Sequence, residues 1–444
     1  MIFVDYLKYK FRLNEILLCV VICLSIANSL IAQDSTLYDN NVRYDSLKVG
    51  EHKSGYGDLN TISGSKSVNA NLVSDDEYKS AWLDTDLARK AFDGFYRFKS
   101  QLKNNYNLAV GMDYMFLNQY TSFSYSDRQA SSGILRIFGT WIAFNIPNDM
   151  QGSLIVKVEN RHLIGSGTPP RQLGYDAGSA LSTASFKVFH WGITNFYWKQ
   201  LFYDDRISIV IGQMDPGDWV DLFPLLDSFR YYLNEAYFNS PAMALPNQGL
   251  GVAVQGFITE HFYVKAGLHD ANGEPNKLGG YNFNSFFKTQ EYFTWIEAGW
   301  TPQFQPMTPQ SIHLTYWHQD AREDAGKSES WGWCFSASTV IDYIWQPFIR
   351  IAISSGDAAL MRKLVIIGTA VNVKGHDYFG VGFNWGGPVD KSKRDQYGIE
   401  LFYSFQLTQH LNLTPDIKLT INPSFNNEKD IVGVYSVLRV RYAM

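Results

Sequence analysis

Charged side chains recur at every second position in several short segments of this chain. In one of them, Lys157, Glu159 and Arg161 alternate with Val156 and Val158. Because successive residues of a β-strand point to opposite faces, this spacing predicts one charged face and one apolar face. Arginine and lysine donate hydrogen bonds, carboxylates accept them, and mixed signs do not retain ions of one charge. The chemistry indicated is weak, reversible contact with polar solutes such as sugars.

The last segment of the chain shows the same pattern clearly. Val434, Leu438 and Val440 fall on one face, and Arg439 and Arg441 fall on the other. A soluble β-sandwich would turn its apolar face inward, whereas a transmembrane barrel turns that face toward lipid and its polar face toward a lumen. The polar faces of these segments carry charge repeatedly, and the sequence ends within a strand. We therefore expect an all-β fold, a transmembrane antiparallel β-barrel, with a soluble all-β protein as the alternative.

Alternating segments follow one another from residue 106 to the end of the chain. A single-chain bacterial barrel has an even number of strands, each about 9–11 residues long. The segments predict about 16 strands, within a range of about 16–18, in a barrel that occupies residues 91–444. Besides the terminal strand, the clearest segments are Tyr106–Asn118, Ile134–Asn145, Ser153–Arg161, Arg206–Met214, Gly249–Ile258, Phe262–Asp270, Glu291–Trp300, Ile312–Gln319, Gln346–Ser354, Lys363–Val373, Tyr378–Trp385, Gln396–Leu407 and Ile417–Asn422. Weaker candidates are Phe186–Trp198, Tyr232–Asn239 and Trp331–Tyr343.

Residues 1–32 have the features of a secretory signal peptide. Lys8, Lys10 and Arg12 precede the apolar run Ile16–Ile31, and the small residue Ala32 marks a cleavage site. The alternative is an N-terminal membrane anchor, although the run is shorter than the ~20 residues of a full span. Residues 33–90 are predicted to form a polar periplasmic leader. A short helix over residues 82–98 is expected to plug or brace the barrel entrance.

The composition agrees with a barrel and excludes other classes. The chain contains 30 Phe, 27 Tyr and 12 Trp, and aromatic residues make up 16% of it. Such a content is typical of a barrel with aromatic girdles at both membrane interfaces. A formal net charge of -5 argues against a nucleic acid as partner. Once the signal peptide is removed, Cys334 is the only cysteine, so no internal disulfide is expected.

The alternation also predicts which side chains face the lumen of the barrel. We expect them to contact the permeating solute, and the alternative is that they are wetted lumen residues without a binding role. The aromatic candidate is expected to stack on sugar rings, or else to pack against an inward-folded loop or the leader. The candidates are Lys157, Glu159, Arg161, Lys265, Glu297, Trp317, Arg350, Glu400, Arg439 and Arg441, with Arg161, Arg350, Arg439 and Glu159 expected at the narrowest point.

One connection is too long for a periplasmic turn. Asp215–Asn234 is rich in aromatic and acidic residues and lies between two clear strand segments. We interpret it as an extracellular loop. It either folds into the lumen and narrows it, or covers the mouth of the barrel.

Enzyme signatures are weak. His313 and His318 are five residues apart on one expected strand, so they point to opposite faces and share no metal ion. Ser185 and His190 are a poor match to the Ser and His that a lipid hydrolase would pair. No enzyme activity, cofactor or metal is therefore expected.

Several segments, taken in order, carry a family resemblance. They are Ile209–Asp215, Asn239–Pro246 leading into Gly249–Gly251, Ala266–Gly273, Tyr397–Tyr403, Leu407–Asp416 and Ile421–Pro423 with the final strand. Together they resemble the carbohydrate-selective porin family (OprB type) of Gram-negative outer membranes. The chain departs from that family at Met444, where an aromatic residue is usual, although Tyr442 keeps an aromatic ring two positions earlier.

The resemblance implies a 16-stranded outer-membrane porin through which carbohydrates diffuse passively. Outer-membrane lipid and the barrel assembly machinery are then expected partners, and a homo-oligomer is left open. The alternatives are an anion-selective pore or a polysaccharide export channel of the same barrel class. An anion-selective pore should show a ladder of inward Lys and Arg with few acids. Instead, Glu159, Glu297 and Glu400 share the inward face with the bases.

Overall fold

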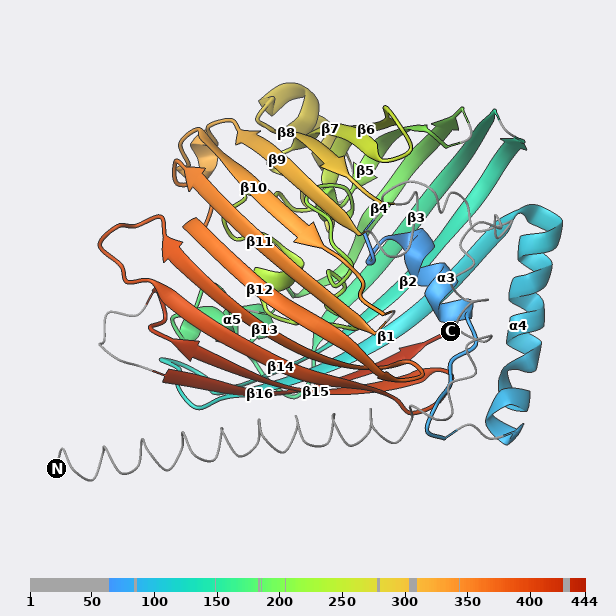
Figure 1. The fold of residues 1–444 in the computed structure, drawn as a ribbon, viewed down its shortest axis with the longest axis horizontal. Helices are drawn as coiled ribbons and strands as arrows, with labels where there is room; N and C mark the ends of the chain where they lie inside the picture. The colour runs from blue at the N-terminus through green and yellow to red at the C-terminus, as the bar shows by residue number, and fades with distance from the viewer. Residues whose placement is uncertain are drawn as a thin grey trace.

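Sixteen antiparallel strands close into a barrel in which β1 pairs with β16 (Figure 1). The computed structural model describes residues 64–444, apart from 84–85, 148, 183, 185, 204, 278–279, 303–309, 343 and 426–431. The strands are β1 (Leu108–Thr121), β2 (Gln129–Ile146), β3 (Met150–Leu163), β4 (Phe189–Phe202), β5 (Ile207–Met214), β6 (Gly249–Phe257), β7 (Phe262–Asp270), β8 (Tyr292–Trp300), β9 (Ser311–Gln319), β10 (Ser330–Ser338), β11 (Trp345–Ser355), β12 (Met361–Lys374), β13 (Asp377–Pro388), β14 (Gln396–Gln406), β15 (Leu411–Ile421) and β16 (Val432–Ala443).

The predicted antiparallel barrel of 16 strands is confirmed, because each observed strand overlaps a segment of period-two alternation. The weak candidate Tyr232–Asn239 is wrong. It contains the short helix α6 (Glu235–Phe238) within the connection between β5 and β6. Tyr232, Leu233 and Tyr237 are fully buried there. Their apolar character therefore reflects burial inside the barrel and not a lipid-facing strand.

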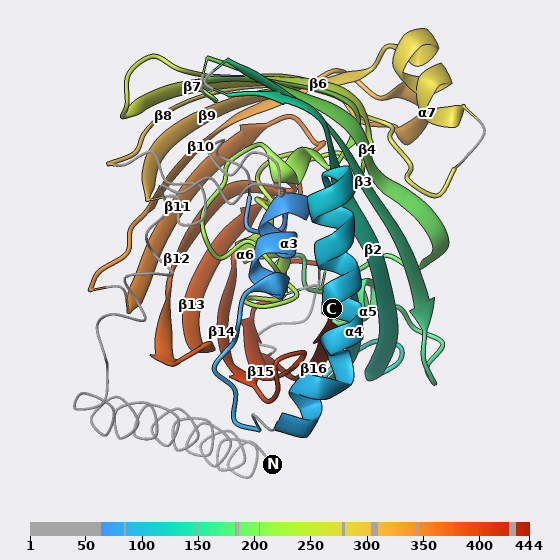
Figure 2. The same ribbon diagram turned by 90° about the vertical axis from the view of Figure 1, so that its right-hand side faces the viewer.

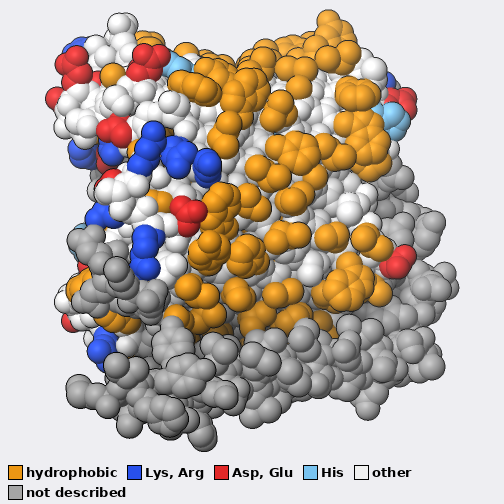
Figure 3. Space-filling view, turned by 60° about the vertical axis from the view of Figure 1, so that its left-hand side comes forward, with side chains coloured by type: hydrophobic (Ala, Val, Ile, Leu, Met, Phe, Trp, Pro, Cys, Tyr) orange, Lys and Arg blue, Asp and Glu red, His pale blue; other side chains and the backbone are white. Residues whose placement is uncertain are grey.

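The outer wall of the barrel is apolar, as Figure 3 shows over one side. Aliphatic side chains stay exposed on the outward face of the strands, and aromatic side chains stand near both ends of the wall. A belt of this kind suits a lipid environment. The outward aliphatic residues include Ile137, Ile211, Ile296, Ile312, Ile351, Ile353, Ile367 and Leu438, and the outward aromatic residues include Trp141, Trp191, Phe262, Trp300, Trp331 and Trp345.

The two ends of the barrel differ in the length of their connections. Near the chain termini the turns are short, as at 147–149 between β2 and β3 and at 375–376 between β12 and β13. At the opposite end the connections 164–188, 215–248 and 271–291 are long. Transmembrane barrels have short periplasmic turns and longer extracellular loops, so the termini lie at the periplasmic end.

Helix α4 (Asp86–Tyr106) lies outside the ring of strands at the periplasmic end (Figure 1). Its Phe92 and Tyr96 pack on His410 in the β14–β15 turn, with ring centroids 4.4 and 5.7 Å apart. The helix expected over 82–98 is therefore longer than predicted and braces the rim. No helix among the described residues is both long and apolar enough to cross a membrane. The proposed signal peptide and residues 33–63 of the proposed leader lie outside the described residues.

Two elements occupy the interior of the barrel, and Figure 2 shows both within the ring of strands. Helix α3 (Val68–Asp76) enters from the periplasmic end, and the connection 215–248, which contains η1 (Pro216–Asp218) and α6, folds in from the other end. We call this connection the inner loop. The two elements meet where the backbone N–H of Gly64 donates to the carbonyl of Asp218. The remaining short helices, α5 (Pro170–Asp176), α7 (Tyr281–Asn284), η2 (Ser285–Thr289) and η3 (Glu323–Ala325), lie in extracellular connections.

Candidate functional site

A row of charged side chains crosses the lumen face of three neighbouring strands. The strand register places Asp113 of β1 opposite Arg136 of β2, and Arg136 opposite Glu159 of β3. Directly opposite residues of antiparallel strands share a face and lie close enough to interact. Arg136 donates through Nε to Asp113 Oδ1 (2.7 Å), and the ring of Phe229 from the inner loop lies 3.6 Å from its guanidinium carbon. The row therefore joins the wall to the inner loop.

Glu159 also holds two bases on its own strand. Arg161 donates through Nε to Glu159 Oε2 (2.7 Å), and Lys157 Nζ lies 3.9 Å from Glu159 Oε1. The guanidinium of Arg161 further stacks on the ring of Phe189, 4.7 Å from its centroid. The structure thus brings Lys157, Glu159 and Arg161 together on the lumen face, where the alternation placed them. Their role as solute contacts stays a prediction.

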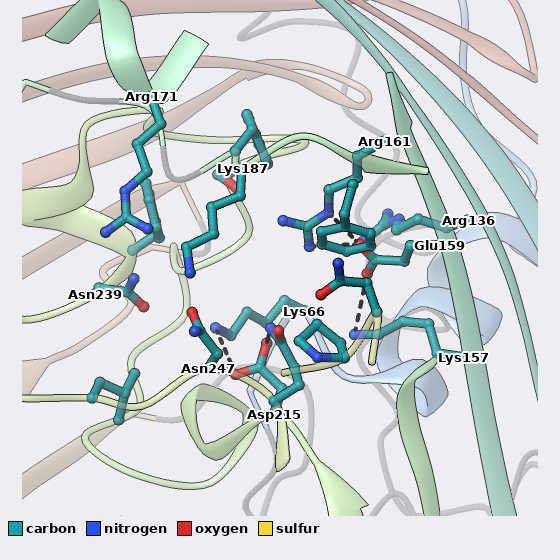
Figure 4. A pocket seen from close by; sticks show the side chains of 18 of the residues that line it. Lys66, Arg136, Lys157, Glu159, Arg161, Arg171, Lys187, Asp215, Asn239 and Asn247 are labelled. Carbon is teal, nitrogen blue, oxygen red and sulfur yellow. Dashed lines mark hydrogen bonds and ion pairs between the residues drawn. The ribbon is translucent and has the colours of Figure 1, made fainter. Parts of the chain in front are cut away.

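These residues form one wall of a polar cavity of about 230 Å³ (Figure 4). The other walls are the connection 164–188, the inner loop and the connection 271–291. Arg171 and Lys187 extend into the cavity from the side opposite Arg161, and Lys66 lies beside Asp215. Among the described residues, the basic ones that line it are Lys66, Arg136, Lys157, Arg161, Arg171 and Lys187, and the acidic ones are Glu159, Asp215, Asp227, Glu235 and Glu274.

Most of the charges around the cavity are already compensated. Burial alone would raise the pKa of Asp215, but the charges of Lys66 and Lys157 outweigh it and lower that pKa to about 2. Arg171 lies 3.9 Å from Glu235. The cavity thus carries bases and ionised acids side by side, so it attracts neither sign of ion strongly.

Two donors stay open to a solute in the cavity. The buried Nε of Arg171 has no hydrogen-bond partner among the described residues. The Lys187 ammonium likewise makes no hydrogen bond or ion pair within that part of the chain, and burial lowers its pKa. Buried donors left unpaired cost free energy, so this arrangement favours water or a polar solute at that point.

The other inward candidates lie beneath the inner loop and bind it. Lys265 and Glu297 form an ion pair of 2.7 Å between β7 and β8. Lys265 donates to the carbonyl of Trp219 (2.9 Å), and Glu297 accepts from the backbone N–H of Asp221 (2.8 Å). The charged side chains of the wall thus form hydrogen bonds with backbone groups of the inner loop that are buried away from solvent.

The same arrangement recurs around the ring. Glu400 accepts from the backbone N–H groups of Leu233 and Asn234, the second at 2.9 Å. Arg439 donates to the carbonyl of Ser228 at 2.7 Å. Trp317 is fully buried and stacks on Phe293, with centroids 6.1 Å apart. Trp317 belongs to the same buried cluster as residues of the inner loop, and its stacking on sugars stays a prediction.

Asp221 is a further anchor of the inner loop. Its carboxylate forms an ion pair with Arg350 Nε (2.8 Å) and contacts His313 Nε2 (3.1 Å). Arg350 also donates to the carbonyls of Asp221 and Asn239, both at 2.9 Å. Burial would raise the pKa of Asp221, but Arg350 and the hydrogen bonds from His313 and Ser336 lower it to about 2. The loop is held to the far wall by an ionised carboxylate.

Ser311, His313 and Asp221 are linked like a hydrolase triad, but they do not form an active site. Ser311 Oγ lies 3.2 Å from His313 Nδ1, and all three residues are buried away from the cavity. Asp221 is committed to Arg350. Ser185 lies outside the described residues, and within that part of the chain no group of His, Cys, Asp and Glu is suited to hold a metal ion.

Helix α3 is locked at the periplasmic side by a second ion network. Asp75 is fully buried and receives two bonds from Arg441 (3.0 and 2.7 Å) and one from Arg230 of the inner loop (2.8 Å). Arg441 also donates to Asp113 (2.8 Å), and Lys79 Nζ lies 3.6 Å from Asp75. Burial would raise the pKa of Asp75, but Arg441, Arg230 and Lys79 hold it well below its ordinary value. One carboxylate thus joins α3, the barrel wall and the inner loop.

Several cavity residues escaped the sequence-based prediction. Arg136 lies in a clear strand segment, and its place between outward Leu135 and Ile137 was a usable signal. Arg171 and Lys187 lie in a connection without periodicity, so nothing in the sequence indicated which way they point. The position of Lys66 depends on where α3 docks, which the sequence does not encode locally.

Comparison with known proteins adds independent evidence. The fold is similar to that of OprB from Pseudomonas putida in its high-pH structure, with a TM-score of 0.63, 15% identity, and coverage of 83% of this chain and 99% of that one. The chain is 22% identical over 318 residues to the porin AaxA of Chlamydia pneumoniae, covering 67% of this chain and 69% of that protein. Residues 347–441, from β11 to β16, match the sequence profile of the carbohydrate-selective porin, OprB family. The last six strands thus carry the sequence profile of that family, and the barrel as a whole has the fold of OprB. The profile match, the related porin and the shared fold together support an outer-membrane porin for sugar diffusion.

Proposed function

We propose that small carbohydrates cross this porin through the polar cavity between β3, the connection 164–188 and the inner loop, with Glu159, Arg161 and Lys187 as their main contacts. The observation that carries the proposal is that three candidates from one strand, Lys157, Glu159 and Arg161, line this cavity. Donors without a partner among the described residues line it with them. A volume of about 230 Å³ is smaller than that of sites for drug-sized ligands and suits a single sugar ring.

Mixed charge favours neutral sugars over the alternatives. An anion-selective pore needs an excess of bases at its narrowest point, but Glu159, Asp215 and Glu235 lie among the bases here. A polysaccharide export channel needs a wide, continuous lumen, and α3 and the inner loop both fill the interior. Export through a cleaved signal peptide, insertion by the barrel assembly machinery and contact with outer-membrane lipid complete the proposal.

Arg161→Ala is expected to weaken sugar block of the channel by a few-fold and to shift ion selectivity toward cations. A hydrogen bond from a charged group contributes about 1.5–3 kcal/mol when it is fully lost, and water replaces part of it. Barrel stability should not change, because Arg161 stands at the edge of the cavity. Planar-bilayer recordings with and without glucose measure both effects.

The matched control is Arg206→Ala, since Arg206 is exposed in the periplasmic turn between β4 and β5. It should leave sugar block unchanged. Unchanged sugar block and unchanged selectivity in Arg161→Ala would remove Arg161 from the solute path.

A further inference from the structure

A group of basic residues stands at the extracellular margin of the apolar belt. Arg362 and Lys363 begin β12, and Lys391, Lys393 and Arg394 follow in the connection 389–395 between β13 and β14. The two groups are neighbours, because the backbone N–H of residue 389 donates to the carbonyl of residue 360. Figure 3 shows Lys and Arg side chains gathered where the hydrophobic belt gives way to polar surface. We call these five residues the rim cluster.

Lys363 points outward from the barrel. It pairs with Ile353 of β11, whose side chain is half exposed on the lipid-facing wall, and its chain neighbour Leu364 is fully buried inside. Residues directly opposite on neighbouring strands share a face. Lys363 is exposed, so its ammonium projects from the outward face of the barrel near the extracellular end of β12.

Three of the five residues in the rim cluster have no counter-charge among the described residues. Arg362, Lys363 and Lys391 make no hydrogen bond or ion pair with the described residues, and the Nε of Arg362 is buried without a partner. Two acids, Asp390 and Asp395, lie among these bases in the connection 389–395. Asp390 accepts from Ser392, and Asp395 accepts from Trp385 Nε1 at 3.0 Å.

Exposed cations beside an apolar belt attract anionic lipid headgroups. The side chains below the cluster are apolar, so a bound ligand must combine negative groups with acyl chains. Outer leaflets of Gram-negative bacteria present phosphorylated glycolipids, whose phosphate groups pair well with Arg and Lys. We propose that the rim cluster binds the phosphate groups of an outer-leaflet glycolipid, with its acyl chains lying along β11 and β12 on Ile351, Ile353 and Ile367.

The test measures binding of purified lipid A to the detergent-solubilised barrel by native mass spectrometry. Native protein should retain bisphosphorylated lipid A. The variant Lys363→Gln/Lys391→Gln should retain it at least several-fold less well, because two unpaired charges are removed. Lys391→Gln alone changes only an exposed loop side chain, so it keeps the test valid if the double variant assembles poorly. Arg206→Gln, at the periplasmic end, is the charge-matched control and should bind like the native protein.

Binding measurements with other ligands distinguish the glycolipid from other anions. Dephosphorylated lipid A and phosphatidylglycerol should bind weakly, and inorganic phosphate should not compete at equal concentration. Equal retention of lipid A by the double variant would overturn the proposal. Equal binding of phosphatidylglycerol, or competition by inorganic phosphate, would also overturn it. Sugar-driven swelling of liposomes should be the same for both variants and native protein, which separates this site from the solute path.

Discussion

Replacing Asp75 with asparagine is expected to raise the single-channel conductance several-fold. The substitution keeps the shape of the side chain but removes the charge that Arg441, Arg230 and Lys79 share. Removing one partner of a buried ion pair costs about 3–5 kcal/mol, and the nine-residue helix buries only three apolar side chains, Val68, Leu72 and Val73. We expect α3 to leave the lumen, and bilayer recordings would register the wider path.

The matched control for this result is Glu77→Gln. Glu77 follows α3 directly, and its carboxylate forms no ion pair with the described residues. Its conductance should equal that of the native channel. The barrel of both variants should remain heat-modifiable on gels, because neither residue lies in a strand. Two results would show that the ion network does not hold the helix in place. One is a conductance of Asp75→Asn equal to that of the native channel, and the other is a conductance of Glu77→Gln as high as that of Asp75→Asn.

Asp221→Asn is expected to admit larger sugars. Asp221 adopts a positive φ of 53°, a conformation that asparagine tolerates, so the backbone of the inner loop is not strained by the change. The lost charge leaves the buried Arg350 unpaired, which costs about 3–5 kcal/mol. The inner loop should then detach from β9 to β11, and the ratio of disaccharide to monosaccharide flux in swelling assays should rise several-fold.

A second variant tests whether the effect of Asp221→Asn comes from the lost ion pair with Arg350 or from the changed sequence of the loop. Arg350→Met/Asp221→Asn removes both charges, so no buried cation is left alone. Its flux ratio should lie closer to the native value than that of Asp221→Asn. A double variant that is at least as permissive as the single one would show that the anchor does not depend on this ion pair.

The wall of the barrel could be derived from the sequence because its signal is local. Period-two alternation placed β7 at its observed bounds and put Lys265, Arg350 and Glu400 on the inward face. The same rule could not tell that these side chains bind a loop. Lys265 meets Glu297 through strand register, and both meet the inner loop through contacts between residues far apart in the chain.

The interior of the barrel was harder to predict for a physical reason. Asp215–Asn234 was expected to fold inward or to cover the mouth, and the structure places it inside. The choice depends on whether wall charges satisfy the backbone of the loop, as Glu400 does for Leu233. Helix α3 is short and carries only a weak apolar face, so its place follows from Asp75 meeting arginines on β16 and the inner loop.

The central claim is that sugars pass through the narrowed lumen, and swelling of liposomes that contain the native protein tests it directly. The account predicts fast swelling in a neutral monosaccharide and little swelling in a trisaccharide of the same osmolarity, because the cavity fits about one sugar ring. Liposomes without protein give the background rate. No swelling in the monosaccharide, or equal rates for both sugars, would contradict the account.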